Sequence, residues 1–455
     1  LQIVLIVSFH KSFSSIVYVT SGVWALSLPL TFTLHLFSGK IKIFENNVAD
    51  FFGLFARTKS IIPIENGKLR ILILNWRDTR HKWTGGAESY VHELSKRWVK
   101  EGNVITVFCG NDSHSQRNEV VDGVNIVRRG GLYTVYLWGF LYYIFKFRGK
   151  YDLIIDSENG LPFFTPLYAK KPVLLVIYHV HQEVFRKHLR FPLSSVARFL
   201  EGSLMPRIYR KNQVVTISQS SKDDILKLGL GKKSDVSIVH PGIETSLFKK
   251  EEKAKNPLFA YVGRLKPYKN VDVAIKAFDQ VVKSYPQARL MIVGEGESAP
   301  DLQKLTRELD LEKSVVFAGR VSEGQKARLL AKSWVVIQPS MVEGWGITVI
   351  EANACGTPVI ASDVNGLKDS VVNGQTGILV PVKDIDGFVH AMIDFILDEK
   401  YRLTLSDNAY SWSHNFSWDK SSKNFFNIVS QSYEKEPEVR PSRLAYAISR
   451  ILSFL

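Results

Sequence analysis

The chain has 455 residues, which is enough for two domains of ordinary size with a substantial core in each. With 45% hydrophobic and 23% charged residues, its composition is that of a globular protein and excludes intrinsic disorder. The formal net charge of +15 favours anionic partners, namely nucleic acid, anionic lipid surfaces or phosphorylated small molecules. The sequence has no zinc-finger or RNA-binding signature and no block of Lys and Arg that resembles a nucleic-acid arm. We therefore expect no nucleic acid and favour a diphosphate substrate and an anionic membrane surface.

Residues 1–66 are predicted to form an apolar N-terminal segment and a linker. No charged residue occurs from Ser12 to Gly39, which is long enough to span a bilayer; its Ser, Thr, Pro and His residues weaken this interpretation, and a leader is the alternative. More Lys and Arg follow the segment than precede it, so an anchor would place the next domain in the cytoplasm. Cys109 and Cys355 have small, apolar neighbours and no metal-binding spacing, which predicts two reduced core thiols. We therefore expect a cytoplasmic, membrane-associated protein.

The folded part is predicted to begin with a Rossmann-like domain over residues 67–245. An apolar run at 71–74, a Gly-rich turn, helix-spaced apolar residues and a second strand at 104–108 together indicate a βαβ unit. Further strands are expected at 151–155, 173–178, 214–217 and 236–239. The aromatic stretch Tyr133–Phe147 is too short to span a membrane and predicts either a membrane-surface element or a helix packed on the sheet.

A second Rossmann-like domain is predicted over residues 246–415, because strand and helix patterns alternate regularly there. Its strands are expected at 259–262, 289–293, 315–317, 335–338, 358–361 and 377–380. The predicted class is therefore α/β, with two doubly wound domains that face each other across a cleft at the carboxyl ends of their strands. Residues 416–455 are predicted to contain a helix that returns to the first domain and a basic tail. This tail, Arg440–Leu455, is either a membrane-surface helix or an ordinary terminal helix.

The strongest chemical signal is the segment 339–361. A strand ends at its first residue and a loop bracketed by glycines opens a helix, so that Gly344 and Gly346 let backbone N–H groups approach an anion. Glu343 lies in the loop, and Glu351 lies about two turns along the helix. Two carboxylates at this spacing can hold sugar hydroxyls at two points along one ligand. The alternative is a solvated helix carboxylate and a simple N-terminal charge.

This segment resembles the E-x7-E signature of the family-4 retaining glycosyltransferases, which have the GT-B fold. The resemblance implies a nucleotide diphosphate-sugar as donor, with Glu343 on the hydroxyls of the donor sugar and Glu351 on the ribose. Residues 262–270 resemble the family's phosphate-binding segment, which implies that Arg264 and Lys269 neutralise the donor diphosphate and stabilise it as a leaving group. Without the rest of the pattern, these two cations would be an ordinary surface pair after a strand.

The resemblance extends to further loops. The turn at Gly85 and Gly86 resembles the glycine loop that approaches the donor phosphate or the acceptor. A His that follows a strand is often near the transferred sugar in this family, which implies a catalytic His179, with His181 as the second choice. The other implied donor contacts lie in the helix-opening loop and in the loop that cradles the nucleotide base: Gly344, Trp345, Gly346, Gly319 and Val321.

We expect neither a catalytic metal nor another cofactor. Asp384 and Asp386 match the D-x-D pattern of metal-dependent glycosyltransferases, but Asp384 is better explained as a helix cap. The segment Asp156-Ser157-Glu158 follows a strand and could face the cleft, yet nothing pairs it with a metal. Because Arg264, Lys269 and helix N-termini can serve the diphosphate, the predicted transfer is metal-independent.

The predicted activity is retaining transfer of a hexose-like sugar from a nucleotide-sugar to an acceptor hydroxyl. A lipid-linked or cell-surface glycan is the favoured acceptor, as in cell-envelope glycan biosynthesis, while the nucleotide and the sugar stay open. Two alternatives remain. One is a nucleotide-sugar epimerase of the same fold, which would need no acceptor, and the other is a membrane-tethered nucleotide-sugar-binding subunit without activity.

Overall fold

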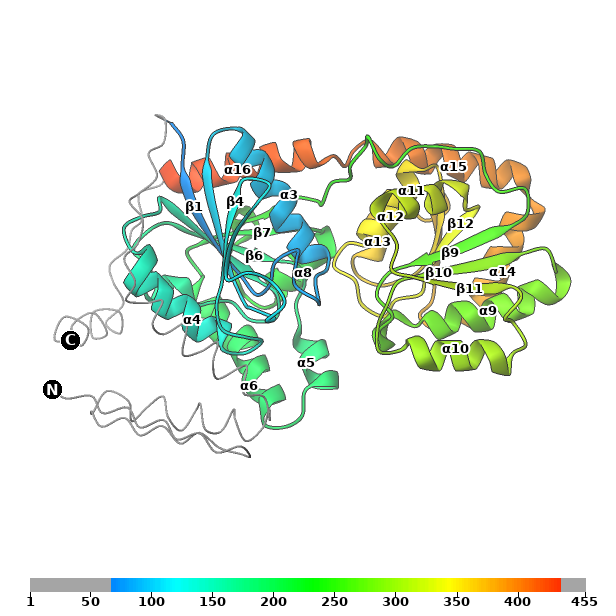
Figure 1. Cartoon of the computed structure of the whole chain (residues 1–455), viewed down its shortest axis with the longest axis horizontal. Helices are drawn as coiled ribbons and strands as arrows, with labels where there is room; N and C mark the ends of the chain where they lie inside the picture. The colour runs from blue at the N-terminus through cyan, green and yellow to red at the C-terminus, as the bar shows by residue number, and fades with distance from the viewer. Residues whose placement is uncertain (1–66, 435–455) are drawn as a thin grey trace, which may run out of the picture.

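The computed structural model of the chain describes residues 67–434. The expected N-terminal anchor and the expected basic tail helix lie outside the described residues. Two α/β domains lie side by side, each built on its own parallel sheet, as predicted (Figure 1). Among residues 67–434, none of the helices is long and apolar enough to cross a bilayer.

The first sheet has eight strands in the order β3-β4-β2-β1-β5-β6-β7-β8, and only the β3–β4 pair is antiparallel. The strands are β1 (Arg70–Asn75), β2 (Val104–Cys109), β3 (Asn118–Val121), β4 (Val124–Arg128), β5 (Leu153–Glu158), β6 (Val173–Ile177), β7 (Gln213–Thr216) and β8 (Val236–Ile238). The central strands are continuous apolar runs because helices cover both faces of the sheet. The sequence analysis missed β3 and β4, which a tight turn at Asp122 and Gly123 joins; both turn residues have positive φ, as such hairpins require.

Helices and short helical turns cover this sheet. They are α3 (Gly86–Lys100), α4 (Val135–Tyr142), η1 (Tyr143–Phe147), η2 (Thr165–Leu167), α5 (Gln182–His188), α6 (Leu193–Phe199), η3 (Leu200–Leu204), α7 (Met205–Ile208), α8 (Gln219–Lys227) and η4 (Lys233–Asp235). The aromatic stretch expected at Tyr133–Phe147 forms α4 and η1. It buries Trp138, Tyr142 and Phe147 in the core cluster on one face of the sheet, so this segment is a helix packed on the sheet.

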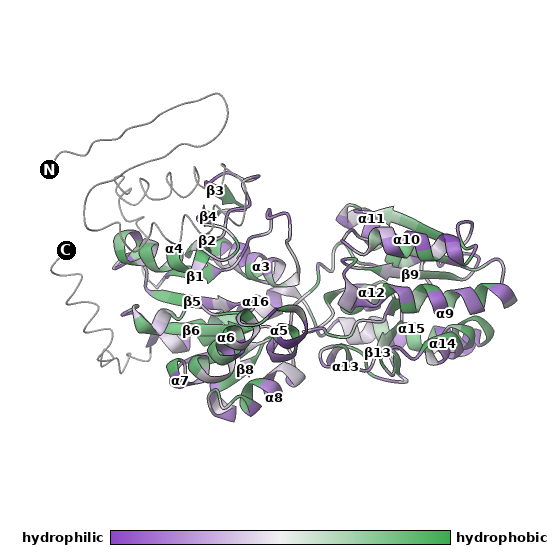
Figure 2. Cartoon of the chain, turned by 90° about the horizontal axis from the view of Figure 1, so that it is seen from below, coloured by the Kyte–Doolittle hydropathy of each residue, from purple (hydrophilic) through white to green (hydrophobic). Residues whose placement is uncertain are grey.

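The second sheet has six parallel strands in the order β11-β10-β9-β12-β13-β14. They are β9 (Leu258–Val262), β10 (Arg289–Val293), β11 (Val315–Gly319), β12 (Val335–Gln338), β13 (Val359–Ser362) and β14 (Gly377–Val380). The helices are η5 (Pro267–Lys269), α9 (Val271–Ser284), α10 (Ala299–Glu308), α11 (Glu323–Lys332), α12 (Ile347–Ala354), α13 (Leu367–Ser370), α14 (Ile385–Leu397) and α15 (Glu399–Ser413). Figure 2 shows helices such as α9 with one apolar and one polar side, as expected for helices that pack on a sheet. The strand order reverses between β9 and β12, which is where such sheets bind ligands.

The chain crosses between the domains twice. Residues 239–257 form the first crossing, and residues 414–417 form the second, which leads into α16 (Trp418–Glu434). Figure 1 shows α16 lying on the first domain although it follows the whole of the second. It packs on α3: the Trp98 indole donates a hydrogen bond to the Ser422 carbonyl at 3.2 Å, and the rings of Trp98 and Phe425 are 5.4 Å apart.

This packing predicts a large stability cost for Phe425→Ala. The side chain is 1% exposed, and its loss leaves a cavity between α16 and α3. We expect the free energy of unfolding of the first domain to fall by about 3–5 kcal/mol in guanidinium titrations. Phe199→Ala is the matched control, because Phe199 is 56% exposed, and it should change stability by less than about 0.5 kcal/mol. Equal effects of the two substitutions would contradict the packing described.

Candidate active site

Two glycines, Gly86 and Gly344, lie at the boundary between the domains. A Cβ atom placed on Gly86, at the start of α3, would lie 3.2 Å from Cδ1 of Ile347 in α12. One placed on Gly344 would lie 3.0 Å from the carbonyl oxygen of Tyr178, which follows β6. Side chains at these two positions would crowd the opposite domain. The glycines therefore allow the loops at the carboxyl ends of both sheets to approach each other closely.

Hydrogen bonds on one side of this contact hold the domains in a closed arrangement. At the start of α8, the Ser220 backbone N–H donates to Asp369 of α13 at 3.1 Å, and the Ser220 hydroxyl also donates to this carboxylate. The Gly366 N–H donates to the same hydroxyl at 2.9 Å. Nearby, the Asn365 amide donates to Asp224 at 2.8 Å. These polar bonds join α8 to α13 across the domain boundary.

The predicted donor residues lie at the switch point of the second sheet. Arg264 and Lys269 follow β9, and Glu343 follows β12. Lys269 and Glu343 form a half-buried ion pair, and the Ser340 hydroxyl donates to the same carboxylate at 3.1 Å. Arg264 is exposed and donates to the Tyr268 hydroxyl at 3.1 Å. The ammonium of Lys269 also lies 5.3 Å from the Tyr268 ring, so this tyrosine links the guanidinium of Arg264 to the Lys269–Glu343 pair.

Arg264 also reaches the first domain. A Cβ atom on Gly85 would lie 3.6 Å from Cζ of Arg264. The Gly85 N–H donates to Glu88 at 2.7 Å, and Glu88 pairs with Arg77 at 2.9 Å, which anchors the turn below the guanidinium. Arg77 and Glu88 were not picked out by the sequence analysis. The guanidinium of Arg264 thus lies between the glycine turn of one domain and the strand ends of the other.

Glu351 lies in α12 and is 7% exposed. Lys326 of α11 forms ion pairs at 2.8 Å with both Glu351 and Glu323. Burial raises the pKa of the Glu351 carboxyl, and the ammonium of Lys326 opposes this shift. Sequence reasoning missed Lys326, because a lysine in an exposed-looking helix carries no signal of its own. The pair makes Glu351 a buried but charge-compensated carboxylate rather than a solvated one.

His179 and His181 follow β6 with their rings 4.0 Å apart. Burial, the neighbouring His181 and the cation of Lys269 hold the pKa of His179 well below its usual value, so its ring is neutral. Burial lowers the pKa of His181 as well, but the carboxylates of Glu158 and Glu201, each 3.4 Å from Nδ1, outweigh burial and raise it to about 10. The structure therefore contains a neutral ring next to a buried cation.

The side chains of Glu158, His181 and Glu201 also present ligand atoms within 4.8 Å of one another, a spacing that a metal ion could use. The His181 backbone N–H donates to Glu201 at 2.6 Å, and the Gly160 N–H donates to Glu158 at 2.8 Å. These bonds and the imidazole compensate only part of the negative charge, because Oε2 of Glu158 is buried without a hydrogen-bond partner and burial raises the pKa of the Glu158 carboxyl. The sequence analysis named Glu158 only within the segment 156–158 and missed Glu201, which lies twenty residues after His181.

The expectation that Asp156 could face the cleft is wrong. This carboxylate is fully buried within the first domain and accepts hydrogen bonds from the Phe163 N–H at 2.9 Å, the Thr165 hydroxyl at 2.8 Å and the Tyr209 hydroxyl. It holds the chain after β5 in place. Asp384 caps α14, accepting from the Gly387 N–H at 3.0 Å, as predicted.

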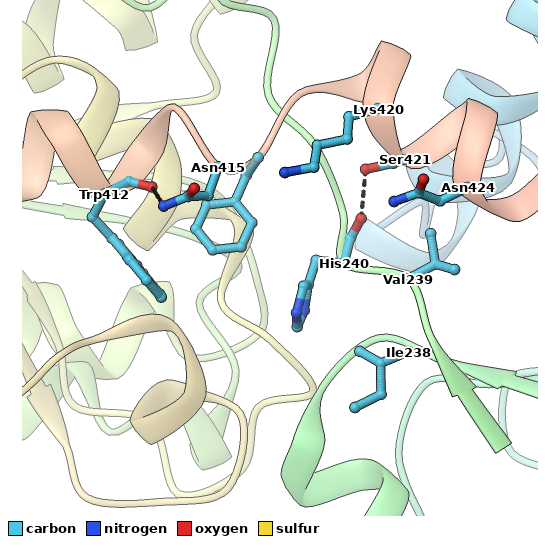
Figure 3. A pocket seen from close by; sticks show the side chains of 9 residues that line it. Ile238, Val239, His240, Trp412, Asn415, Lys420, Ser421 and Asn424 are labelled. Atoms are coloured by element: carbon cyan, nitrogen blue, oxygen red, sulfur yellow. Dashed lines mark hydrogen bonds between the residues drawn. The ribbon is translucent and has the colours of Figure 1, made fainter. Parts of the chain in front are cut away.

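Trp345 lies at the boundary of the domains but faces the crossings. It is 2% exposed, and its ring stacks on His240 with centroids 4.3 Å apart and packs against Phe416 at 5.2 Å. His240 and Phe416 also line a pocket of about 300 Å³ between the two crossings. Figure 3 shows this pocket and the Ser421 hydroxyl, which donates to the His240 carbonyl at 2.7 Å. Trp345 therefore has a packing role at the crossings, and donor contact by its side chain stays a prediction.

The remaining predicted donor residues lie on the second domain. Gly346 caps the start of α12 with a φ of 79°. Gly319 ends β11 with a φ of 63°, and its carbonyl accepts from the Gly294 N–H at 2.9 Å. Val321 follows in the half-buried loop before α11. Contact of these residues with a nucleotide stays a prediction.

Both domains match models of known protein families. Residues 84–247 match Glycosyltransferase Family 4, and residues 242–412 match Glycosyl transferases group 1. The two matches together span both domains and the first crossing. The chain belongs to the family-4, group 1 glycosyltransferases with the GT-B fold.

Among the relatives, the D-inositol 3-phosphate glycosyltransferase of Acidothermus cellulolyticus is 27% identical over 51% of this chain and 56% of its own length. The chain thus matches little more than half of that protein. Sucrose-phosphate synthase from Thermosynechococcus elongatus has a similar fold, with a TM-score of 0.70 and 20% identity over 81% of this chain and 100% of that one. Anabaena HepE in complex with UDP-glucose has a TM-score of 0.64 and 19% identity over 80% and 100% of the two chains.

The buried His181 predicts a pH-dependent stability. Its pKa is about 10 in the fold and 6.5 ordinarily, so protonation of the ring stabilises the fold fully below about pH 6.5, and this contribution is lost as the pH rises towards 10. Glu201→Gln keeps the acceptor for the His181 N–H but removes a charge, which lowers the pKa of the ring. The free energy of unfolding should then fall less between about pH 7 and about pH 10 than in the unaltered chain.

Denaturant titrations at the two pH values measure this difference. Glu183→Gln is the control, because it removes an exposed carboxylate paired with Arg186 on the adjoining helix and should leave the pH dependence unchanged. If Glu201→Gln follows the same pH curve as the unaltered chain, the charged state assigned to His181 is wrong.

Proposed function

We propose that the chain is a retaining glycosyltransferase that moves a hexose from a nucleotide diphosphate-sugar to an acceptor hydroxyl. One observation carries this proposal: Arg264, Lys269 and Glu343 lie together at the switch point of the second sheet, and Arg264 also approaches the glycine turn of the first domain. A diphosphate needs concentrated positive charge, and a sugar needs carboxylates that accept from its hydroxyls. Both requirements are met within one group of side chains.

The ion pair between Lys269 and Glu343 suggests how the donor is accommodated. When a diphosphate enters, its oxygens compete for the ammonium of Lys269, and the hydroxyls of the sugar compete for the carboxylate of Glu343. The pair would then be exchanged for two contacts with the same ligand. The compensated carboxylate of Glu351 would accept from the ribose hydroxyls. UDP-glucose is the first donor to test, because the similar fold of Anabaena HepE has been solved with it.

The transfer step is assigned to residues on both sides of the domain boundary. The cations stabilise the departing diphosphate, and the acceptor hydroxyl attacks from the same face within the closed cleft. His179, which is neutral because of its burial and the cations beside it, can exchange hydrogen bonds with the transferred sugar without adding charge. No covalent nucleophile is assigned, so the two-carboxylate mechanism of glycosidases is not invoked.

Arg264→Ala should lower kcat/KM for a donor that the chain accepts by about a hundredfold or more, because it removes a charged donor to the leaving group. Donors are first found by their protection of the chain against thermal unfolding, and turnover is then measured with each. Lys266→Ala is the matched control. It removes a cation two residues away that pairs with Glu297 at 2.8 Å, and it should leave kcat/KM within about twofold. Equal rates in Arg264→Ala and the unaltered chain would remove Arg264 from the proposed site.

Transfer should also proceed without a divalent metal and with retention at the anomeric carbon. The cations of the chain replace the charge that a metal would bring to the diphosphate. Turnover in excess chelator should match turnover in added Mg²⁺ or Mn²⁺, and nuclear magnetic resonance of the product should show the anomeric configuration of the donor. A reaction that stops in chelator and resumes with metal would contradict metal independence, and an inverted product would contradict retention.

A further inference from the structure

The segment between α5 and α6 exposes large apolar side chains in one place. The loop and α6 present an apolar strip made of Phe191, Leu193, Val196 and Phe199, which are 84%, 61%, 51% and 56% exposed. The helical members recur every three residues and therefore share one side of α6. Clustered exposure of four large apolar residues on so short a segment is unlike the scattered exposure that ordinary surfaces show.

Basic side chains border the apolar strip. Four exposed cations lie on α5, on α6 or in the loop between them: Arg186, Lys187, Arg190 and Arg198. Residues 182–211 contain seven Lys or Arg and two Glu; of the two, Glu201 is buried and Glu183 is already paired with Arg186. The α5–α6 segment therefore exposes both large apolar side chains and an excess of positive charge.

The strip is connected directly to the proposed site. α5 begins one residue after His181, and the Gln182 side chain donates to the Arg198 carbonyl at 3.1 Å and to Glu201 at 2.7 Å. These bonds join the helix that carries the strip to the carboxylate that holds His181. Figure 1 shows α5 and α6 projecting together from one end of the first domain, with α5 on the side of the second domain, and Figure 2 looks onto this end.

We propose that the α5–α6 projection docks on an anionic lipid bilayer by inserting the apolar strip, so that the cleft is held over a membrane-resident acceptor. Apolar side chains enter the boundary between headgroups and acyl chains, while the flanking arginines and lysines meet anionic headgroups. The net charge of +15 adds a general attraction to the same surface. A second copy of the chain fits less well, because facing copies would bring these cations against one another. Only the nature of the acceptor rests on the proposed function; docking itself does not.

An environment-sensitive fluorophore on a single introduced cysteine tests the docking in the full chain. Val196→Cys places the label on the strip, and Leu403→Cys in α15 is the matched control, since the two native side chains are 51% and 52% exposed. The native cysteines are buried and should not react. With vesicles of phosphatidylglycerol, we expect a blue shift and brighter emission at position 196 and no change at position 403. Vesicles of phosphatidylcholine should give a smaller response.

A second variant tests whether the apolar strip itself inserts or whether another part of the chain binds the vesicles. Phe191→Ser, Leu193→Ser and Phe199→Ser together, with the label at 196, should weaken the fluorescence response to vesicles by about tenfold or more. Docking is overturned if the label at 196 does not respond, if both labels respond equally, or if the serine substitutions change nothing. It is also overturned if the response appears without vesicles and grows with protein concentration, which would indicate pairing of two copies. Because no donor is present, these results do not depend on whether the chain transfers sugar.

Discussion

Charge compensation at the end of the second sheet is the constraint on which the site depends. Cationic side chains that bind a diphosphate also need partners or solvent contact when no ligand is bound. The Lys269–Glu343 ion pair and the contact of Arg264 with a phenol and a glycine turn meet this requirement in different ways. Lys269 is neutralised by an anion of the same domain, whereas the guanidinium of Arg264 stays exposed at the domain boundary. Such an arrangement keeps donors and acceptors preorganised, so that little reorganisation is needed when a ligand binds.

The same principle applies across the boundary. His179 lies beside a buried imidazolium, and that cation is held by two carboxylates from different parts of the chain, Glu158 at the end of β5 and Glu201 in η3. At the domain boundary, the second domain thus carries paired charges, and the first carries a neutral ring beside a buried cation. Gly86 and Gly344 have no side chains, and this allows the loops of the two domains to approach each other closely.

Much of this could be predicted from the sequence because it depends on local patterns. Apolar runs that end in Gly, Pro or Asn mark buried parallel strands, and the spacing of Glu343 and Glu351 is a property of one loop and one helix. What could not be predicted depends on partners far apart in the chain. Lys326 meets Glu351 only because α11 and α12 pack together, and Asp156 turns inward because Tyr209 lies above it. The short β3–β4 hairpin was missed although its Asp-Gly turn is a local signal.

The position of α16 bears on how the protein is made. Tyr90 and Trp98 of α3 are covered by Trp418 and Phe425, which the ribosome adds only after the entire second domain. While the chain is still being synthesised, α3 of the first domain therefore keeps an open apolar face after β8 is complete, until residues 239–417 have been added. Domains usually complete themselves in order from the amino terminus. Within residues 67–434, α16 is the last helix to be synthesised, and it closes the core of the first domain. The two domains therefore complete their folding together, and a chain that ended before α16 would leave this core exposed to water.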